Sequence, residues 1–258
     1  MCGIFFSCNL GNHRYPDVSI TQRLERRGPD DTKTVSHSMV IEPSRFLNDK
    51  QHPMEWSLVA VSSVLSLRGD TFIRQPIQNA HSDPLSDSFL CWNGEAWKVD
   101  STTIQGSDAD VVFDLLTEAT KPKHHSTGKG IASIEISQST LQATTAAISS
   151  IAGPFAFVFY DALNHRIFYG RDLLGRRSLL INMRSNGCLE ICSVSSQHRP
   201  HEWKEVEADG VYVIDFTSIF PRDDKGMLSR QNFLRPLHVP WTAPALESQS
   251  RYVLVRDP

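Results

Sequence analysis

Met1-Cys2-Gly3-Ile4-Phe5-Phe6-Ser7-Cys8 opens the chain, a short apolar run rich in Ile and Phe. Such a run is typical of a buried strand, and this one places Cys2 at the strand's beginning. Removal of Met1, which the small side chain behind it favours, makes Cys2 the N-terminal residue. Its thiol then lies beside its own α-amine, whose pKa of about 7.7–8.0 suits it to take the thiol proton. The stretch predicts an N-terminal nucleophile; the alternative is an ordinary thiol behind a retained or acetylated N-terminus.

The composition is that of an ordinary globular protein. The 258 residues suffice for one large domain or two small ones. With a formal net charge of −3 and no basic run, nothing favours nucleic acid or an anionic membrane as a partner. Without a long apolar run or a signal peptide, we expect the chain in the cytoplasm or nucleus. The five cysteines are expected to be reduced there and lack paired metal-ligand spacing, so no metal site is predicted.

Apolar and aromatic runs predict an α+β domain dominated by antiparallel strands. Helices are predicted at residues 21–27, from a start at Ser107 or Asp108, and at residues 141–151. Polar residues 120–139 predict a surface insertion between the last two helices. Strands are predicted at residues 56–67, 88–92, 155–160, 165–170, 178–183, 189–194 and 210–216.

Three short motifs accompany Cys2-Gly3-Ile4 further along the chain. They are Arg27-Gly28-Pro29-Asp30, Trp92-Asn93-Gly94-Glu95 and Gly106-Ser107-Asp108. Each has an ordinary alternative, because the first can be a plain turn, Asn93-Gly94 a hairpin turn, and Asp108 a helix cap. Their order and spacing together resemble the class II glutamine amidotransferase domain, the N-terminal-nucleophile type found at the head of asparagine synthetases.

Two later segments extend this resemblance. Residues 153–161 look like the closing hairpin of that family, and residues 170–180, Gly-Arg-Asp-Leu-Leu-Gly-Arg-Arg-Ser-Leu-Leu, look like its Arg-Asp-x-x-Gly turn. The ending is most similar to the asparagine synthetase domain-containing subfamily. The resemblance implies a four-layer αββα sandwich of N-terminal nucleophile hydrolases over residues 2–218, with an insertion near 120–139. Residues 219–258 are then a linker or tail, and the synthetase domain is absent.

The resemblance also implies roles for individual residues. Cys2 matches the nucleophile that attacks the side-chain amide of glutamine. Asn93 and Gly94 match the donors of the oxyanion hole, whose individual loss typically costs about 10²–10³-fold in rate. Glu95 matches a residue that lines the pocket, and Asp108 the carboxylate that holds the α-amino group.

One stretch departs from the family pattern. The substrate-binding segment reads Val64-Leu65-Ser66-Leu67-Arg68, with Val64 where the family usually has an arginine for the substrate carboxylate. Arg68 is four residues further on, about 13 Å along a strand at about 3.3 Å per residue, so it does not simply replace that arginine. Arg171 and Asp172 are expected to form an ion pair that fixes a turn, without a catalytic role.

These matches imply a glutaminase that hydrolyses glutamine to glutamate and ammonia through a thioester. The ammonia would serve asparagine synthesis, as in a glutamine-hydrolysing asparagine synthase, on a separate synthetase domain or chain. No cofactor is predicted for this chain, since ATP and magnesium belong to that synthetase part, whose Ser-Gly-Gly-type loop the sequence lacks. One alternative is a weak or inactive amidotransferase-like domain used for protein interaction. Another is an N-terminal hydrolase acting on a different amide.

Overall fold

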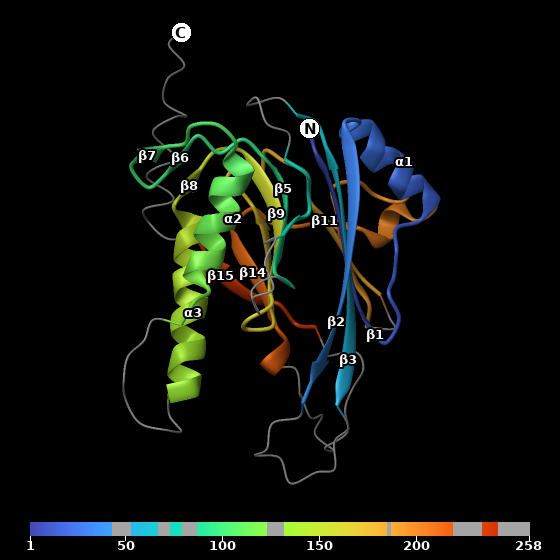
Figure 1. Ribbon diagram of the computed structural model, residues 1–258. Coiled ribbons are helices and arrows are strands. Elements are labelled where there is room, and N and C mark those ends of the chain that lie inside the picture. Colours follow the sequence, from blue (N-terminus) through green and yellow to red (C-terminus); the bar gives the residue numbers. More distant parts are fainter. Residues whose placement is uncertain are drawn as a thin grey trace.

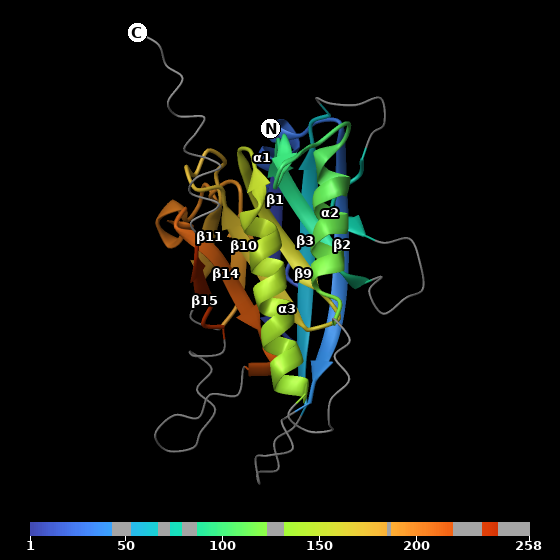
Figure 2. The same cartoon turned by 90° about the vertical axis from the view of Figure 1, so that its left-hand side faces the viewer.

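The computed structural model describes residues 1–42, 53–66, 73–78, 87–122, 132–184, 187–218 and 234–241, with only the backbone of 132–137. Two six-stranded antiparallel sheets lie face to face, with helices on both outer sides (Figure 1). Seen from the side, α2 and α3 run along one outer face (Figure 2). The predicted α+β class and the four-layer αββα order are confirmed.

The first sheet explains why the N-terminal run is continuously apolar. In it, β1 (Gly3–Leu10) pairs with β3 (Met54–Val64) on one side and β12 (Leu189–Cys192) on the other. Ile4 and Phe6 join the core between the two sheets, whereas Phe5 packs toward α1. The strand is buried on both faces because it lies between a sheet and a helix, so it shows no alternation of apolar and polar residues. The sheet is completed by β2 (Asp31–Ile41), β11 (Leu180–Met183) and β13 (Lys204–Glu205).

The second sheet is built in the same way. In β9 (Phe155–Asp161), Ala156, Val158 and Tyr160 face the inter-sheet core, while the phenylalanines between them face α2 and α3. Its order is β15 (Leu237–Pro240), β14 (Gly210–Asp215), β10 (Arg166–Arg171), β9, β5 (Phe89–Gly94) and β4 (Ile77–Gln78). A small third sheet holds β6 (Lys98–Val99), β7 (Thr102–Thr103) and β8 (Ile151–Ala152).

The helices begin and end where local chemistry directs. The first, α1 (Val18–Arg27), is capped by Asp17, whose side chain accepts from the Ile20 N–H at 2.9 Å, and Gly28 is its C-cap. The second, α2 (Asp108–Ala119), starts after Ser107, and the third, α3 (Ala132–Ser149), packs beside it. Short 3₁₀ turns occupy Pro200–Glu202 and Phe216–Ser218.

Parts of the predicted layout were wrong. The helix expected at residues 141–151 is α3, which begins at Ala132 and ends at Ser149, so residues 132–139 of the predicted insertion are helical. The predicted tail from residue 219 contains β15, which pairs with β14 in register Leu237 to Val213. Trp241 follows it, 8% exposed, and its indole N–H donates to the Ala208 carbonyl at 2.8 Å. The second sheet therefore extends past residue 218.

Candidate active site

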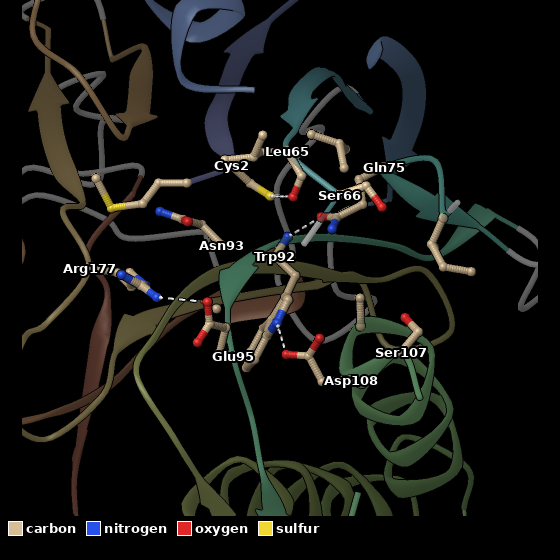
Figure 3. A pocket seen from close by; sticks show the side chains of 15 residues that line it. Cys2, Leu65, Ser66, Gln75, Trp92, Asn93, Glu95, Ser107, Asp108 and Arg177 are labelled. Carbon is tan, nitrogen blue, oxygen red and sulfur yellow. Dashed lines mark hydrogen bonds and ion pairs between the residues drawn. The ribbon is translucent and has the colours of Figure 1, made fainter. Parts of the chain in front are cut away.

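A pocket lies where β1 begins, β3 and β5 end and α2 begins (Figure 3). The structure brings eight of the predicted site residues together in its wall. They are Cys2, Val64, Leu65, Ser66, Asn93, Gly94, Glu95 and Asp108. The other two, Leu67 and Arg68, lie outside the described residues. Four segments separated in sequence thus meet in one place.

The thiol of Cys2 is half-buried at the start of β1. Its Sγ lies 3.8 Å from the Leu65 carbonyl oxygen, and the Cys2 carbonyl accepts from Arg27 Nε at 3.3 Å. Burial raises the pKa of the Cys2 thiol above its ordinary value; nearby Asp108 raises it further and the Arg177 cation lowers it. A thiol in this setting is mostly protonated at neutral pH, so nucleophilic attack requires a base beside it.

Asn93 and Gly94 are the last residues of β5, opposite Ala156 and Phe155 of β9. The hairpin-turn alternative for Asn93-Gly94 is therefore wrong. Asn93 is 1% exposed, and its amide nitrogen Nδ2 is buried with no hydrogen-bond partner among the described residues. A buried amide donor without a partner costs about 1–3 kcal/mol, so it needs an explanation such as a ligand atom.

Gly94 is required by close packing. A Cβ at this position would lie 2.7 Å from the Trp92 ring and 2.8 Å from the Phe155 Cβ. Because those two rings stack at 5.2 Å, neither can yield without disturbing the other. Gly94, which also lines the pocket, is thus held in place on its core side.

Asp108 is the first residue of α2, and Ser107 occupies the cap position without a side-chain hydrogen bond. The helix-cap alternative for Asp108 is therefore wrong. Its Oδ2 instead accepts from Trp92 Nε1 and from the Ala96 N–H, each at 2.8 Å. The side chain is 8% exposed at a helix N-terminus, where the helix dipole favours a negative charge.

Glu95 and Arg177 face each other on the opposite side of Trp92 from Asp108 (Figure 3). Their closest charged atoms, Arg177 Nη2 and Glu95 Oε1, lie 3.7 Å apart, and Arg177 Nε is buried without a hydrogen-bond partner in the described part of the chain. The carbonyl of Arg177 accepts from Arg171 Nε at 2.7 Å. The pocket therefore contains a loosely paired cation whose backbone is held by the turn before it.

The expected ion pair between Arg171 and Asp172 was wrong. Asp172 pairs with Arg176 at 2.8 Å and accepts from the Phe155 N–H at 3.1 Å, whereas Arg171 pairs with Glu205 at 2.6 Å. Neighbouring residues in extended backbone point to opposite faces, so the two side chains diverge. Asp172 nevertheless fixes the turn, because its carboxylate also accepts from the Arg176 N–H at 3.1 Å.

The Arg27-Gly28-Pro29-Asp30 turn lies against the pocket rim. A Cβ on Gly28 would come within 2.4 Å of the Ser63 carbonyl carbon and the Val64 nitrogen, so the two backbones are in close contact. The Asp30 N–H donates to the Val64 carbonyl at 3.0 Å, and Asp30 Oδ2 accepts from the Ser66 N–H at 2.8 Å. The turn thus holds the end of β3 and the residues that follow it in the pocket wall.

Seven residues that line the pocket were not predicted from the sequence to do so. They are Met1, Ile73, Gln75, Trp92, Ser107, Ala109 and Arg177. Gln75 supports β5, since its Oε1 accepts from the Trp92 N–H at 2.8 Å. Trp92 and Ser107 stood inside the motifs already quoted, whereas nothing in the sequence distinguished Gln75.

Among the described residues, no group of three or more His, Cys, Asp or Glu side chains could hold a metal ion. No helix of the described part is long and apolar enough to cross a membrane. The chemical groups in the pocket wall include a thiol, an amide, two carboxylates and an arginine.

The layer order and the N-terminal thiol pocket are those that the sequence resemblance implied. The resemblance to asparagine synthetase domain-containing proteins is confirmed. The chain is 28% identical over 224 residues to asparagine synthetase domain-containing protein 1 of Homo sapiens, covering 84% of this chain and 29% of that protein. It is 29% identical over 223 residues to the protein of that name from Gallus gallus, covering 83% of this chain and 29% of the relative.

The chain thus spans less than a third of the length of these curated relatives. No family model matches it. Among solved structures, it is similar to a glutamine phosphoribosylpyrophosphate amidotransferase from B. subtilis, with 14% identity and a TM-score of 0.45. That similarity covers 93% of this chain and 49% of the other.

Proposed function

We propose that this domain is a glutaminase of the class II amidotransferase type, which hydrolyses the side-chain amide of glutamine to glutamate and ammonia. The observation that carries the proposal is that one pocket is lined by the Cys2 thiol and by Asn93, whose buried Nδ2 has no hydrogen-bond partner among the described residues. A nucleophile beside an unused hydrogen-bond donor is the arrangement that acyl transfer requires.

Removal of Met1 supplies the base for the reaction. The freed α-amine of Cys2 takes the thiol proton, and the thiolate forms a bond to the amide carbon of glutamine. The carbonyl π electrons move to oxygen, and Asn93 Nδ2 with the Gly94 N–H stabilises that oxyanion. The C–N bond then breaks, the α-ammonium returns its proton to the leaving nitrogen, and ammonia departs from a thioester.

Water completes the cycle. The α-amine takes a proton from water as its oxygen attacks the thioester, and the C–S bond breaks to give glutamate. The thiolate recovers the proton. No electron acceptor or metal is needed for either half of the reaction, because both are acyl transfers.

The carboxylate of Asp108 is suited to the α-ammonium group of the substrate. Its Oδ2 accepts from two N–H donors, and Trp92 stands between it and the Glu95–Arg177 pair (Figure 3). A hydrogen bond between charged partners contributes about 1.5–3 kcal/mol. An amide substrate without a nearby amine would forgo that contact, which favours glutamine over the alternative of an unrelated amide.

Val64 favours the second candidate, an amidotransferase-like domain used for protein interaction. It places an apolar side chain, 5% exposed, in the pocket wall where the resemblance implies an arginine. Arg177 is the arginine among the described lining residues, and it is engaged with Glu95. Weak affinity for glutamine is the expected consequence, since a bidentate arginine contact is among the strongest available to a carboxylate.

We further propose that the ammonia feeds asparagine synthesis on a synthetase domain or chain outside the sequence described here. The relatives support this proposal in two ways. Their names contain asparagine synthetase, and they are more than three times as long as the segment that matches this chain. ATP and magnesium would belong to that partner.

Ammonia release from millimolar glutamine by the wild type and by Cys2→Ala tests the proposal. Mass spectrometry must first show that Met1 is absent and the N-terminus unblocked. We expect release from the wild type and none above background from Cys2→Ala. Absence of release from the correctly processed wild type would favour the interaction domain, and equal release from both proteins would remove Cys2 from the mechanism.

A further inference from the structure

Asp108 accepts two hydrogen bonds, and both donors belong to the segment that contains Asn93 and Gly94. Trp92 precedes Asn93, and Ala96 follows Glu95. Asp108 Oδ2 accepts from the Trp92 indole at 2.8 Å and from the Ala96 backbone at 2.8 Å. One oxygen atom of α2 therefore holds the chain on both sides of Asn93-Gly94.

We propose that Asp108 is a positioning residue that fixes the geometry of the oxyanion donors Asn93 and Gly94, in addition to any contact with a substrate amine. The inference rests on the proposed function, because it assigns a second task within the same pocket. Both bonds use Oδ2, so the two tasks fall on different oxygens of one carboxylate.

Burial makes these bonds consequential. Trp92 is 2% exposed and Ala96 is fully buried, so water cannot readily replace the carboxylate as their acceptor. Loss of the acceptor would remove one buried hydrogen bond from each of these two residues, and the 92–96 segment would shift in response. Oxyanion donors tolerate little movement, since a displacement of about 1 Å in a catalytic geometry can cost about 10²-fold in rate.

The pairing of β5 with β9 ends at Gly94, so the residues after it depend on other hydrogen bonds for their position. Gly94 is the last residue of β5 paired with β9, opposite Phe155. Beyond it, the Glu95 N–H donates to the Pro154 carbonyl at 2.9 Å and the Trp97 N–H to the Ala152 carbonyl at 3.0 Å. The Ala96 N–H between them points the other way, to Asp108. Successive N–H groups of residues 95–97 thus donate alternately to the backbone around β8 and β9 and to Asp108 of α2.

Two substitutions separate positioning from amine binding. Trp92→Phe removes the indole donor while leaving Asp108 and any substrate amine untouched. Asp108→Asn keeps the shape and removes the charge. Asp110→Asn is the matched control, because Asp110 stands in the same first turn of α2 and lies outside the pocket wall.

The first readout does not need turnover. Cys2 is labelled by a glutamine analogue that carries an electrophilic diazoketone in place of the amide, and separately by iodoacetamide. The ketone oxygen depends on the oxyanion donors, whereas alkylation by iodoacetamide does not. We expect Trp92→Phe and Asp108→Asn to lower the ratio of the two labelling rates by about 10-fold or more, with Asp110→Asn unchanged.

The second readout is the split between kcat and KM on glutamine. A positioning role predicts that Trp92→Phe lowers kcat with little change in KM. Wild-type-like labelling ratio and kcat in a folded Trp92→Phe protein would overturn the inference, and so would an Asp108→Asn variant with a raised KM as its sole defect. If the wild type itself gives neither ketone labelling nor ammonia, the proposed function fails instead.

Discussion

The contact between the Gly28 turn and β3 predicts a specific loss when Gly28 is replaced by alanine. The new Cβ would lie 2.4 Å from two backbone atoms of Ser63 and Val64, so the turn must move by about 1 Å to reach ordinary contact distance. Moving it breaks the bond from Asp30 N–H to the Val64 carbonyl and the bond from Ser66 N–H to Asp30 Oδ2.

The size of the effect follows from those two bonds. The neutral bond contributes about 0.5–1.5 kcal/mol, and the solvent-exposed bond to the carboxylate about 1.5 kcal/mol, the lower end for a charged partner. Alanine also restricts the unfolded chain, which offsets about 0.4–1 kcal/mol. We therefore expect the free energy of unfolding of Gly28→Ala to fall by about 2 kcal/mol.

Urea unfolding measures this change. The midpoint should fall while the slope with denaturant stays constant, because the same surface is exposed. Gly170→Ala in β10 is the matched control, since the nearest heavy atom to its added Cβ is 3.1 Å away and it lies outside the pocket wall. We expect that control to change by less than about 1 kcal/mol. Equal stabilities of Gly28→Ala and the wild type would refute the close contact.

Three more substitutions have definite expected outcomes. Asn93→Ala should lower kcat about 10²–10³-fold without lowering the melting temperature, because its Nδ2 makes no hydrogen bond in the described structure; a lower melting temperature would contradict this. Arg177→Met removes a cation that lowers the pKa of the Cys2 thiol, so the midpoint of the iodoacetamide rate against pH should move upward; a downward move would be inconsistent. Asp17→Ala removes the cap of α1 and should cost about 1 kcal/mol in urea unfolding, and no change would argue against the cap.

The strands that face both cores could be predicted from the sequence. Runs such as Phe155–Asp161 are apolar throughout because one face meets the other sheet and the other face meets helices. In contrast, β2 (Asp31–Ile41) was missed. It is an edge strand with polar residues at most of its exposed positions, so it offers no apolar run.

Prolines in one place and a polar stretch in another misled the prediction. β15 was taken for a linker because Pro236 precedes it and Pro240 ends it, yet an edge strand tolerates a residue without an N–H. The start of α3 was taken for part of a surface insertion because residues 120–139 are polar and contain Lys-Pro-Lys-His-His and Gly-Lys-Gly, yet the helix begins at Ala132.

The site could be assembled from motifs only through the resemblance, because its residues come from four distant segments. Spacing alone could not show that Asp108 bonds to Trp92 and Ala96 and not to its own helix, since that depends on how α2 meets β5. Arg177 was missed for the same reason. The sequence predicted only an ion pair between Arg171 and Asp172 in this turn, whereas the residue that lines the pocket is Arg177, five residues after Asp172.

The proposed reaction requires that Cys2 is acylated by glutamine. Intact-mass and peptide spectrometry on the Met1-free protein, quenched in acid during incubation with glutamine, measures that step directly. We expect a glutamyl adduct on the N-terminal peptide, confined to Cys2 and lost with Cys2→Ala. A correctly processed protein with no adduct and no ammonia, or with its adduct on Cys8, would contradict the account.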